Sequence, residues 1–244
     1  MHICICKHYF IMKKTISLLI LSILLFSCEK EKKNMIITGK IEGLKKGTLY
    51  LQKMMDTVIF SVDSIELYGD NNFLLSDNIT SPEMYYLSYK GDVKDKKIMF
   101  FGEKGEIVIN DNIELFGFKP EISGSKNQEI LDDFNETNHK FKMTRLDFIK
   151  KDFEARATKD TLAIDSLEFA YKKMVRKRFL FTTNFAISHK DSEAAPYIAL
   201  SELFDANIYL LDTINNSLTN HVKTSLYGKR LQKFIDDVKT TSPQ

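Results

Sequence analysis

The apolar residues of this chain repeat with one period before Ser125 and with a different period after it. In residues 35–124 they form short runs that alternate with polar residues and are separated by turn residues, as in antiparallel strands. From Ser125 onward they recur every three or four residues, which is the spacing of one helix face. The change predicts an α+β fold, with an antiparallel β-sandwich or open barrel over 35–124 and an all-helical domain over 125–240.

The expected strands are short and are joined by turns that contain glycine or polar residues. Gly43 and Gly47 bound a loop suited to a hairpin, and Gly102 and Gly105 bound another. Strands of this length and even spacing favour a sandwich or barrel. The predicted strands are residues 36–41, 48–52, 57–67, 73–75, 84–89, 98–101 and 107–109.

The helical part is expected to begin directly after Ser125. Ser125 followed three residues later by Gln128 has the pattern of a capping box, in which each side chain bonds to the backbone of the other residue. Pro196 is expected near the start of a later helix. The predicted helices run from Ser125 to beyond Phe153, over 160–188, from Pro196 to Phe204, and over 208–214 and 226–238, with 217–225 between the last two and 241–244 as a tail.

Met12 to Cys28 has the composition of a secretory signal. Lys13 and Lys14 come first, an apolar run over 16–26 follows, and the small residue Ser27 precedes Cys28. The run is shorter than the roughly 18 residues that a membrane-spanning helix needs, so we expect residues 1–27 to be a cleaved signal. The signal is compatible with a translation start at Met1 or at Met12, and the position of the two lysines directly after Met12 favours Met12.

The end of this signal, Leu25-Phe26-Ser27-Cys28, resembles a bacterial lipobox. The resemblance implies that Cys28 is lipidated, becomes the first mature residue and attaches the chain to a lipid bilayer. Residues 28–34 are then a charged tether. Six extended residues reach at most about 20 Å, so the folded part is expected to stay close to the membrane.

The composition of the mature chain excludes several classes of function. Residues 28–244 carry 32 Lys and Arg against 33 Asp and Glu, which gives no basis for a nucleic-acid partner. Every cysteine lies at or before Cys28, so the mature chain has no disulfide and no Cys-based metal site. Cys4, Cys6 and His8 lie upstream of the cleavage site and are expected to leave with the signal.

The mature chain offers few residues for a catalytic, cofactor-binding or metal site. His139, His189 and His221 are not at helical ligand spacing, and we expect them at the surface or at helix ends. Asp132 and Asp133 are neighbours on a helix and point about 100° apart, so they do not share a site. The sequence therefore predicts no enzyme, no metal and no cofactor. Five aromatic residues of the predicted strands have two interpretations. They could line a binding face, although aromatic residues that alternate along a strand more often belong to the core. They are Tyr85, Tyr86, Tyr89, Phe100 and Phe101.

The densest positive cluster in the chain has two interpretations. It could contact anionic lipid headgroups near the anchor. It could equally be the solvated face of a long helix, supported by Glu168 four residues before Lys172, and such faces are the more common case. The cluster consists of Lys172, Lys173, Arg176, Lys177 and Arg178.

Over residues 35–240 the chain resembles a family of lipoproteins common in Bacteroidota. Their N-terminal β-domain has no assigned function and often precedes a thioredoxin-fold, thiol–disulfide interchange or peroxiredoxin-like domain. The matching stretches are residues 38–44, 47–51, 62–65, 81–85, 99–105, 122–125 and 225–231. They are mostly turn glycines and strand positions, and no Cys-x-x-Cys is present, so the redox activity does not carry over.

These observations predict a non-catalytic cell-envelope lipoprotein that acts as a binding or scaffold module for an envelope partner. An alternative is an accessory protein that docks onto a separate thioredoxin-like oxidoreductase in the periplasm. A hydrolase or transferase with carboxylates that converge only in three dimensions is a third interpretation. The resemblance implies attachment to the outer membrane with the body in the periplasm. In these lipoproteins an acidic cluster directly after the cysteine favours display on the cell surface, and Glu29-Lys30-Glu31-Lys32 matches that pattern poorly because acids and lysines alternate in it.

Overall fold

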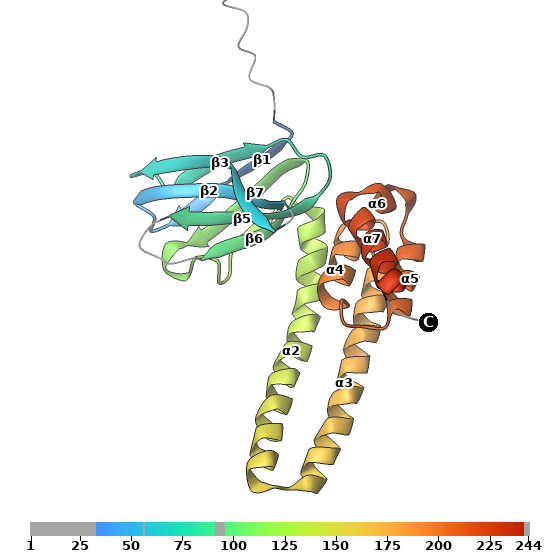
Figure 1. Ribbon diagram of the computed structural model, residues 1–244. Coiled ribbons are helices and arrows are strands. Elements are labelled where there is room, and N and C mark those ends of the chain that lie inside the picture. Colours follow the sequence, from blue (N-terminus) through green and yellow to red (C-terminus); the bar gives the residue numbers. More distant parts are fainter. Residues whose placement is uncertain (1–32, 56, 91–95, 242–244) are drawn as a thin grey trace, which may run out of the picture. The chain divides into compact units, whose positions relative to one another are not determined.

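The computed structural model describes residues 33–55, 57–90 and 96–241. The predicted signal over 1–27 and the predicted lipidation of Cys28 lie outside these residues. Asn34–Gln244 form one compact unit (Figure 1). No helix in the described part of the chain is long and apolar enough to cross a membrane.

Two four-stranded sheets make up the first half of this unit. One sheet has the strand order β4-β1-β7-β8, and the other has the order β3-β2-β5-β6. The strands are β1(Met35–Glu42), β2(Lys46–Met55), β3(Val58–Tyr68), β4(Asn72–Asp77), β5(Glu83–Lys90), β6(Lys97–Gly102), β7(Gly105–Asn112) and β8(Glu121–Ser123), with a short 3₁₀ helix η2(Ile113–Leu115).

One strand pair departs from the predicted antiparallel arrangement. β1 pairs with β4 in antiparallel fashion, but with β7 in parallel, with Ile37 opposite Ile107. Short turns can only join neighbours in antiparallel pairs, whereas β1 and β7 are far apart in the sequence and are joined by no short turn. A period of two in the sequence does not distinguish the two pairings.

The two sheets enclose one hydrophobic core. Leu49 and Leu51 on β2 and Ile107 and Ile109 on β7 point inward from opposite sheets because side chains alternate across a strand. Tyr85 and Phe100, both in this core, are stacked with ring centroids 5.9 Å apart. Tyr86 and Tyr89 are only half-buried, so the strand aromatics are not all core residues.

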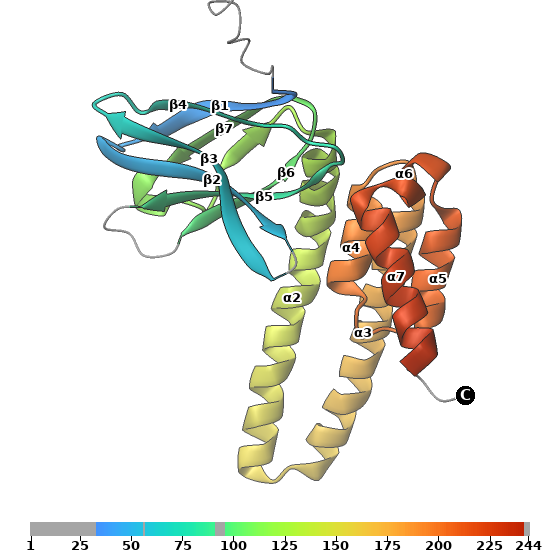
Figure 2. The ribbon, with the colours of Figure 1, turned by 45° about the horizontal axis from the view of Figure 1, so that its top comes forward.

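The second half of the unit is helical, which confirms the predicted α+β fold (Figures 1 and 2). Two long antiparallel helices, α2 and α3, form a hairpin, and shorter helices pack against the C-terminal half of α3. The helices are α2(Lys126–Thr158), α3(Thr161–Ser188), α4(Ala194–Glu202), α5(Ile208–Ser217), α6(Asn220–Thr224) and α7(Leu226–Thr241).

Local signals in the sequence set most of the helix ends. The Ser125 side chain caps α2 by accepting a hydrogen bond from the Gln128 N–H, as predicted. Lys159 ends α2 with φ of 58°, and the Asp160 side chain caps α3 by accepting from the Ala163 N–H. Helix α6 was not predicted, because its five residues have no resolvable period.

The predicted capping box is only half formed. The Gln128 side chain donates to Asp132 Oδ1 at 2.7 Å and accepts from the Phe101 N–H at 2.8 Å, so it is used to join α2 to β6. Glu103 accepts from the backbone N–H of Lys126 at 2.6 Å, and a carboxylate at a helix N-terminus is favourable. The β6–β7 turn therefore holds the first turn of α2.

A small aromatic cluster joins the sandwich to the helices. Phe101 is fully buried, and its ring packs edge-on against Tyr197 of α4 and Tyr227 of α7, with centroids 5.5 and 5.8 Å away. The Met84 N–H of β5 donates to the Tyr227 hydroxyl at 3.0 Å. Since Phe100 points into the sandwich, Phe101 points out of it, and the helices cover what would otherwise be an exposed apolar side chain.

Candidate functional site

One half-buried group of charged residues lies at the end of the sandwich. Lys53 Nζ is 3.0 Å from Asp77 Oδ2 and 3.3 Å from Glu83 Oε1. The Tyr85 hydroxyl donates to the same Asp77 oxygen at 2.7 Å and lies 3.3 Å from Lys53 Nζ. Among the described residues this group comes nearest to the geometry of an acid–base site.

The directions of the pKa shifts in this group favour its ordinary charge states. Burial works to lower the pKa of Lys53, but the hydrogen bond to Asp77 and the charge of Glu83 outweigh it and raise the pKa. Burial works to raise the pKa of Asp77, but the hydrogen bonds from Tyr85 and Lys53 outweigh it and lower the pKa. Burial, then Asp77, raises the pKa of Tyr85 far above its usual range. A general acid or base needs shifts toward neutrality, so this arrangement suits an ion pair that joins β2, β4 and β5.

Replacing Asp77 by asparagine is expected to lower the free energy of unfolding near neutral pH by about 1–3 kcal/mol. The pKa of Asp77 is lower in the folded state than in the unfolded state. Its carboxylate therefore contributes to the stability of the fold above about pH 4, and this contribution is lost as the pH falls through the pKa of the folded state. The melting temperatures of the two proteins should therefore converge in acid. Thermal unfolding across this pH range tests it, with the exposed Glu42→Gln as control; a gap that does not change with pH would contradict the assignment.

A second polar group lies where α2 begins. The Asn127 side chain donates to Glu103 and, at 3.4 Å, to Glu193, and its oxygen accepts from the Ser192 hydroxyl at 2.7 Å. His221 Nε2 lies 3.0 Å from Glu193 Oε1. The Asn127 amide thus joins the β6–β7 turn to the α3–α4 connection. We interpret this group as a structural junction, since each member has a backbone or side-chain partner in it.

The structure keeps the histidines apart. His139 is exposed on α2, His189 ends α3 with its ring stacked 4.2 Å from that of Phe185, and His221 lies on α6. In the described residues no group of three or more His, Cys, Asp or Glu is placed to hold a metal ion.

Asp132 lies in a cleft of about 440 Å³ between β6, α2 and α4, which Met99 and Tyr197 also line. Burial raises the pKa of Asp132 despite the hydrogen bond from Gln128. Asp133, the next residue on α2, is not among the residues that line this cleft.

The predicted basic cluster lies on α3 but does not act as one surface. Arg178 is half-buried, and its Nη1 lies 3.1 Å from Glu202 Oε2, so it fixes α3 to α4. Lys172 is exposed and pairs with Glu168 at 2.6 Å. Lys173, Arg176 and Lys177 are exposed on the same helix.

Two adjoining grooves flank this part of α3, and Tyr171 lines both of them. The first, of about 270 Å³, lies between α2 and α3, and the second, of about 540 Å³, lies between α3 and the start of α5. The first is lined by Phe148, Ile149, Asp152, Arg156, Leu167, Glu168 and Tyr171. The second is lined by Tyr171, Lys172, Val175, Arg176, Phe179, Leu180, Asn207, Tyr209 and Leu210.

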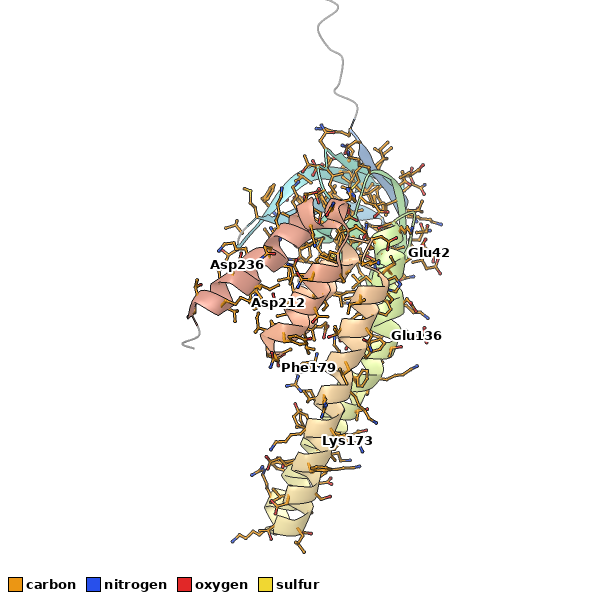
Figure 3. The ribbon with its side chains drawn as sticks, turned by 90° about the vertical axis from the view of Figure 1, so that its right-hand side faces the viewer. Glu42, Glu136, Lys173, Phe179, Asp212 and Asp236 are labelled. Carbon is orange, nitrogen blue, oxygen red and sulfur yellow. The ribbon has the colours of Figure 1, made fainter. Side chains whose placement is uncertain are left out.

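Large apolar side chains are exposed on the hairpin near the turn between α2 and α3. Phe153 is 75% exposed, Leu162 82% and Phe169 73%. Near the turn between α2 and α3, no other helix or strand of the described chain lies beside the hairpin in either view (Figures 1 and 2). In Figure 3, which looks onto α3, Lys173 lies on this uncovered stretch and Phe179 lies at the level of α5.

Sequence periodicity did not find this surface. Leu162 and Phe169 lie seven residues apart, at helical spacing, and no role was predicted for them. The available signal was that α3 has more apolar positions than one contact face can bury.

Comparisons with known proteins bear on the sandwich alone. Residues 35–131 match a family model described as a domain of unknown function (DUF4369). The match ends within α2, just after the residues that Glu103 and Phe101 hold. No curated protein and no solved structure matches the chain.

Proposed function

We propose that this chain is a non-catalytic cell-envelope lipoprotein, attached through acylated Cys28, that acts as a binding or scaffold module through its α2–α3 hairpin. The order of residues from Met12 to Cys28 supports the anchor. The resemblance to Bacteroidota lipoproteins supports attachment to the outer membrane with the body facing the periplasm.

One observation carries the assignment of the contact surface. The hairpin exposes the large apolar side chains of Phe153, Leu162 and Phe169 on a stretch that the other described helices leave uncovered, and a groove of about 270 Å³ lies between its two helices. Exposed apolar surface of this kind is costly in water and typically marks an interaction site. The ion-pair group around Lys53 supports a role without catalysis, because its pKa shifts oppose proton transfer near neutral pH.

The anchor is tested by replacing Cys28 with serine in the full chain. We expect the variant to leave envelope membranes in a carbonate wash that retains the wild type, because attachment through two or more acyl chains is effectively permanent. Equal retention of both proteins would contradict the anchor.

The contact surface is tested by photo-crosslinking in intact cells. A photoreactive residue at Phe153 is expected to give a defined adduct with an envelope component. The same residue at Phe118, which is 81% exposed on the sandwich, should give none. Absence of an adduct at Phe153, or equal adducts at both positions, would contradict the proposal. A thiol-redox protein in the Phe153 adduct would favour the alternative of docking onto a thioredoxin-like oxidoreductase.

A further inference from the structure

We infer that the outer face of α3 binds the surface of an anionic lipid bilayer, which makes it a second membrane contact besides the acylated cysteine. The inference rests on the proposed function and names what its contact surface binds. The face is defined by Leu162, Phe169, Lys173, Arg176 and Leu180 and is called the α3 stripe below.

The spacing of the α3 stripe places its five residues on one side of the helix. The other four residues lie 7, 11, 14 and 18 positions after Leu162. At 100° per residue all five side chains therefore project within about 60° of one another around the helix axis. All five are exposed. Three large apolar side chains with two cations among them form the pattern of a helix that lies in a membrane interface, where the apolar side chains enter the acyl boundary and the cations bind lipid phosphates.

The charge of the hairpin favours an anionic bilayer as the partner. Residues 140–178 carry 12 Lys and Arg against 6 Asp and Glu, whereas the rest of Asn34–Gln244 carries 17 against 25. A negative surface therefore attracts this segment of the hairpin and repels the remainder of the body. Two acids lie within the turn before Phe169 on α3. Asp165 is exposed at the edge of the stripe, about 20° from Arg176, whereas Glu168 points away from the stripe and pairs with Lys172.

The surroundings of the α3 stripe extend the same surface. Tyr209 of α5 is 71% exposed and lines the groove next to Arg176 and Leu180. An exposed tyrosine is well suited to the headgroup level, since its ring is apolar and its hydroxyl is polar. Arg178 is not part of this surface, because Glu202 holds it.

The α2–α3 turn lies far from Asn34, the first residue of the compact unit. Asn34 accepts a hydrogen bond from the Gly105 N–H, and Glu103 caps α2, so α2 begins close to where the tether enters the fold. The 33 residues of α2 then carry the chain about 50 Å to the α2–α3 turn. Contact through the α3 stripe would fix the orientation of the body on the bilayer, because it adds a second point of attachment to the one at Cys28.

The test measures binding of the compact unit Asn34–Gln244, which lacks Cys28, to vesicles of about one third phosphatidylglycerol and two thirds phosphatidylcholine. We expect binding to these vesicles, loss of binding with added salt, and little binding to phosphatidylcholine alone. Lys173→Gln with Arg176→Gln should lower the partition coefficient roughly 25-fold, at about fivefold for each charge. Phe169→Ser should lower it about tenfold.

Matched variants separate the α3 stripe from charge and hydrophobicity in general. Lys45→Gln with Lys229→Gln removes two exposed cations elsewhere, and Phe118→Ser removes an exposed aromatic; both should bind like the wild type. Because all substituted side chains are exposed, unfolding transitions should stay unchanged. Binding that is unaffected by the stripe variants, or equally reduced by the controls, would overturn the inference.

Failure of this inference and failure of the proposed function give different results. If the vesicles are not bound, and crosslinking from the hairpin captures an acidic envelope protein or a second copy of the chain, the bilayer is the wrong partner and the binding module stands. If neither vesicles nor an envelope component is bound, both are wrong.

Discussion

Replacing Phe101 by alanine is expected to lower the free energy of unfolding by about 3–5 kcal/mol. The Phe101 ring is fully buried between the rings of Tyr197 and Tyr227, so its removal leaves a cavity at the point where sandwich and helices meet. For a domain of this size the loss corresponds to roughly 6–20 °C in melting temperature. Chemical denaturation monitored by circular dichroism measures it.

The matched control for Phe101 is Phe118. Its side chain is 81% exposed, so Phe118→Ala should change the stability by less than about 0.5 kcal/mol. The Phe101 variant should also separate the transitions of the two halves, because Phe101 is a principal contact between β6 and the helices. A single unchanged transition in Phe101→Ala would contradict the role assigned to this cluster.

Replacing Gly39 by alanine is expected to lower the free energy of unfolding at least as much as Phe101→Ala does, and to impair folding. A Cβ at position 39 would lie 1.8 Å from the backbone oxygen of Ile109, on the neighbouring strand β7. The clash is with backbone rather than with a movable side chain, so relief requires β1 and β7 to separate. Since these strands form the parallel pair at the centre of their sheet, we expect a loss of more than about 3 kcal/mol.

Gly69→Ala is the control for this prediction. Gly69 has φ of 79°, but no atom lies within 4 Å of the position of an added Cβ. Its substitution should therefore cost only the strain of the left-handed conformation, about 1–2 kcal/mol. Equal losses at the two positions, measured by denaturant unfolding, would show that close packing of β1 on β7 is not what requires Gly39.

The local patterns of the sequence were sufficient for most elements. Alternation in segments such as 48–52 predicted strands, and Ser125 predicted the start of α2, because strand alternation and capping depend on residues that are close in sequence. The resemblance motifs have a structural explanation here: Gly39 lies against a neighbouring backbone, and a Cβ at Gly228 would lie 2.0 Å from the Val222 oxygen. Helix α6 was missed because five residues are too few to establish a period.

The candidate surface could be predicted only in part. The sequence identified Lys173 and Arg176 as members of a basic cluster on a helix. It also grouped Arg178 with them, although Arg178 faces Glu202 across to α4. The surplus of apolar positions on α3 indicated that some are exposed, but not that Phe169 is one of them, because this depends on whether another element covers that face.

By itself, the sequence determined the kind of each segment: strands before Ser125, helices after it, and a signal-like start up to Cys28. These properties follow from backbone preferences and from side-chain spacing within a few residues. Only the tertiary structure decided that β1 pairs with β7 in parallel, that Phe101 and Gln128 join the two halves, and that the hairpin is left uncovered near the α2–α3 turn. Each of these depends on residues far apart in the chain, whose meeting is set by how whole elements pack and not by any local pattern.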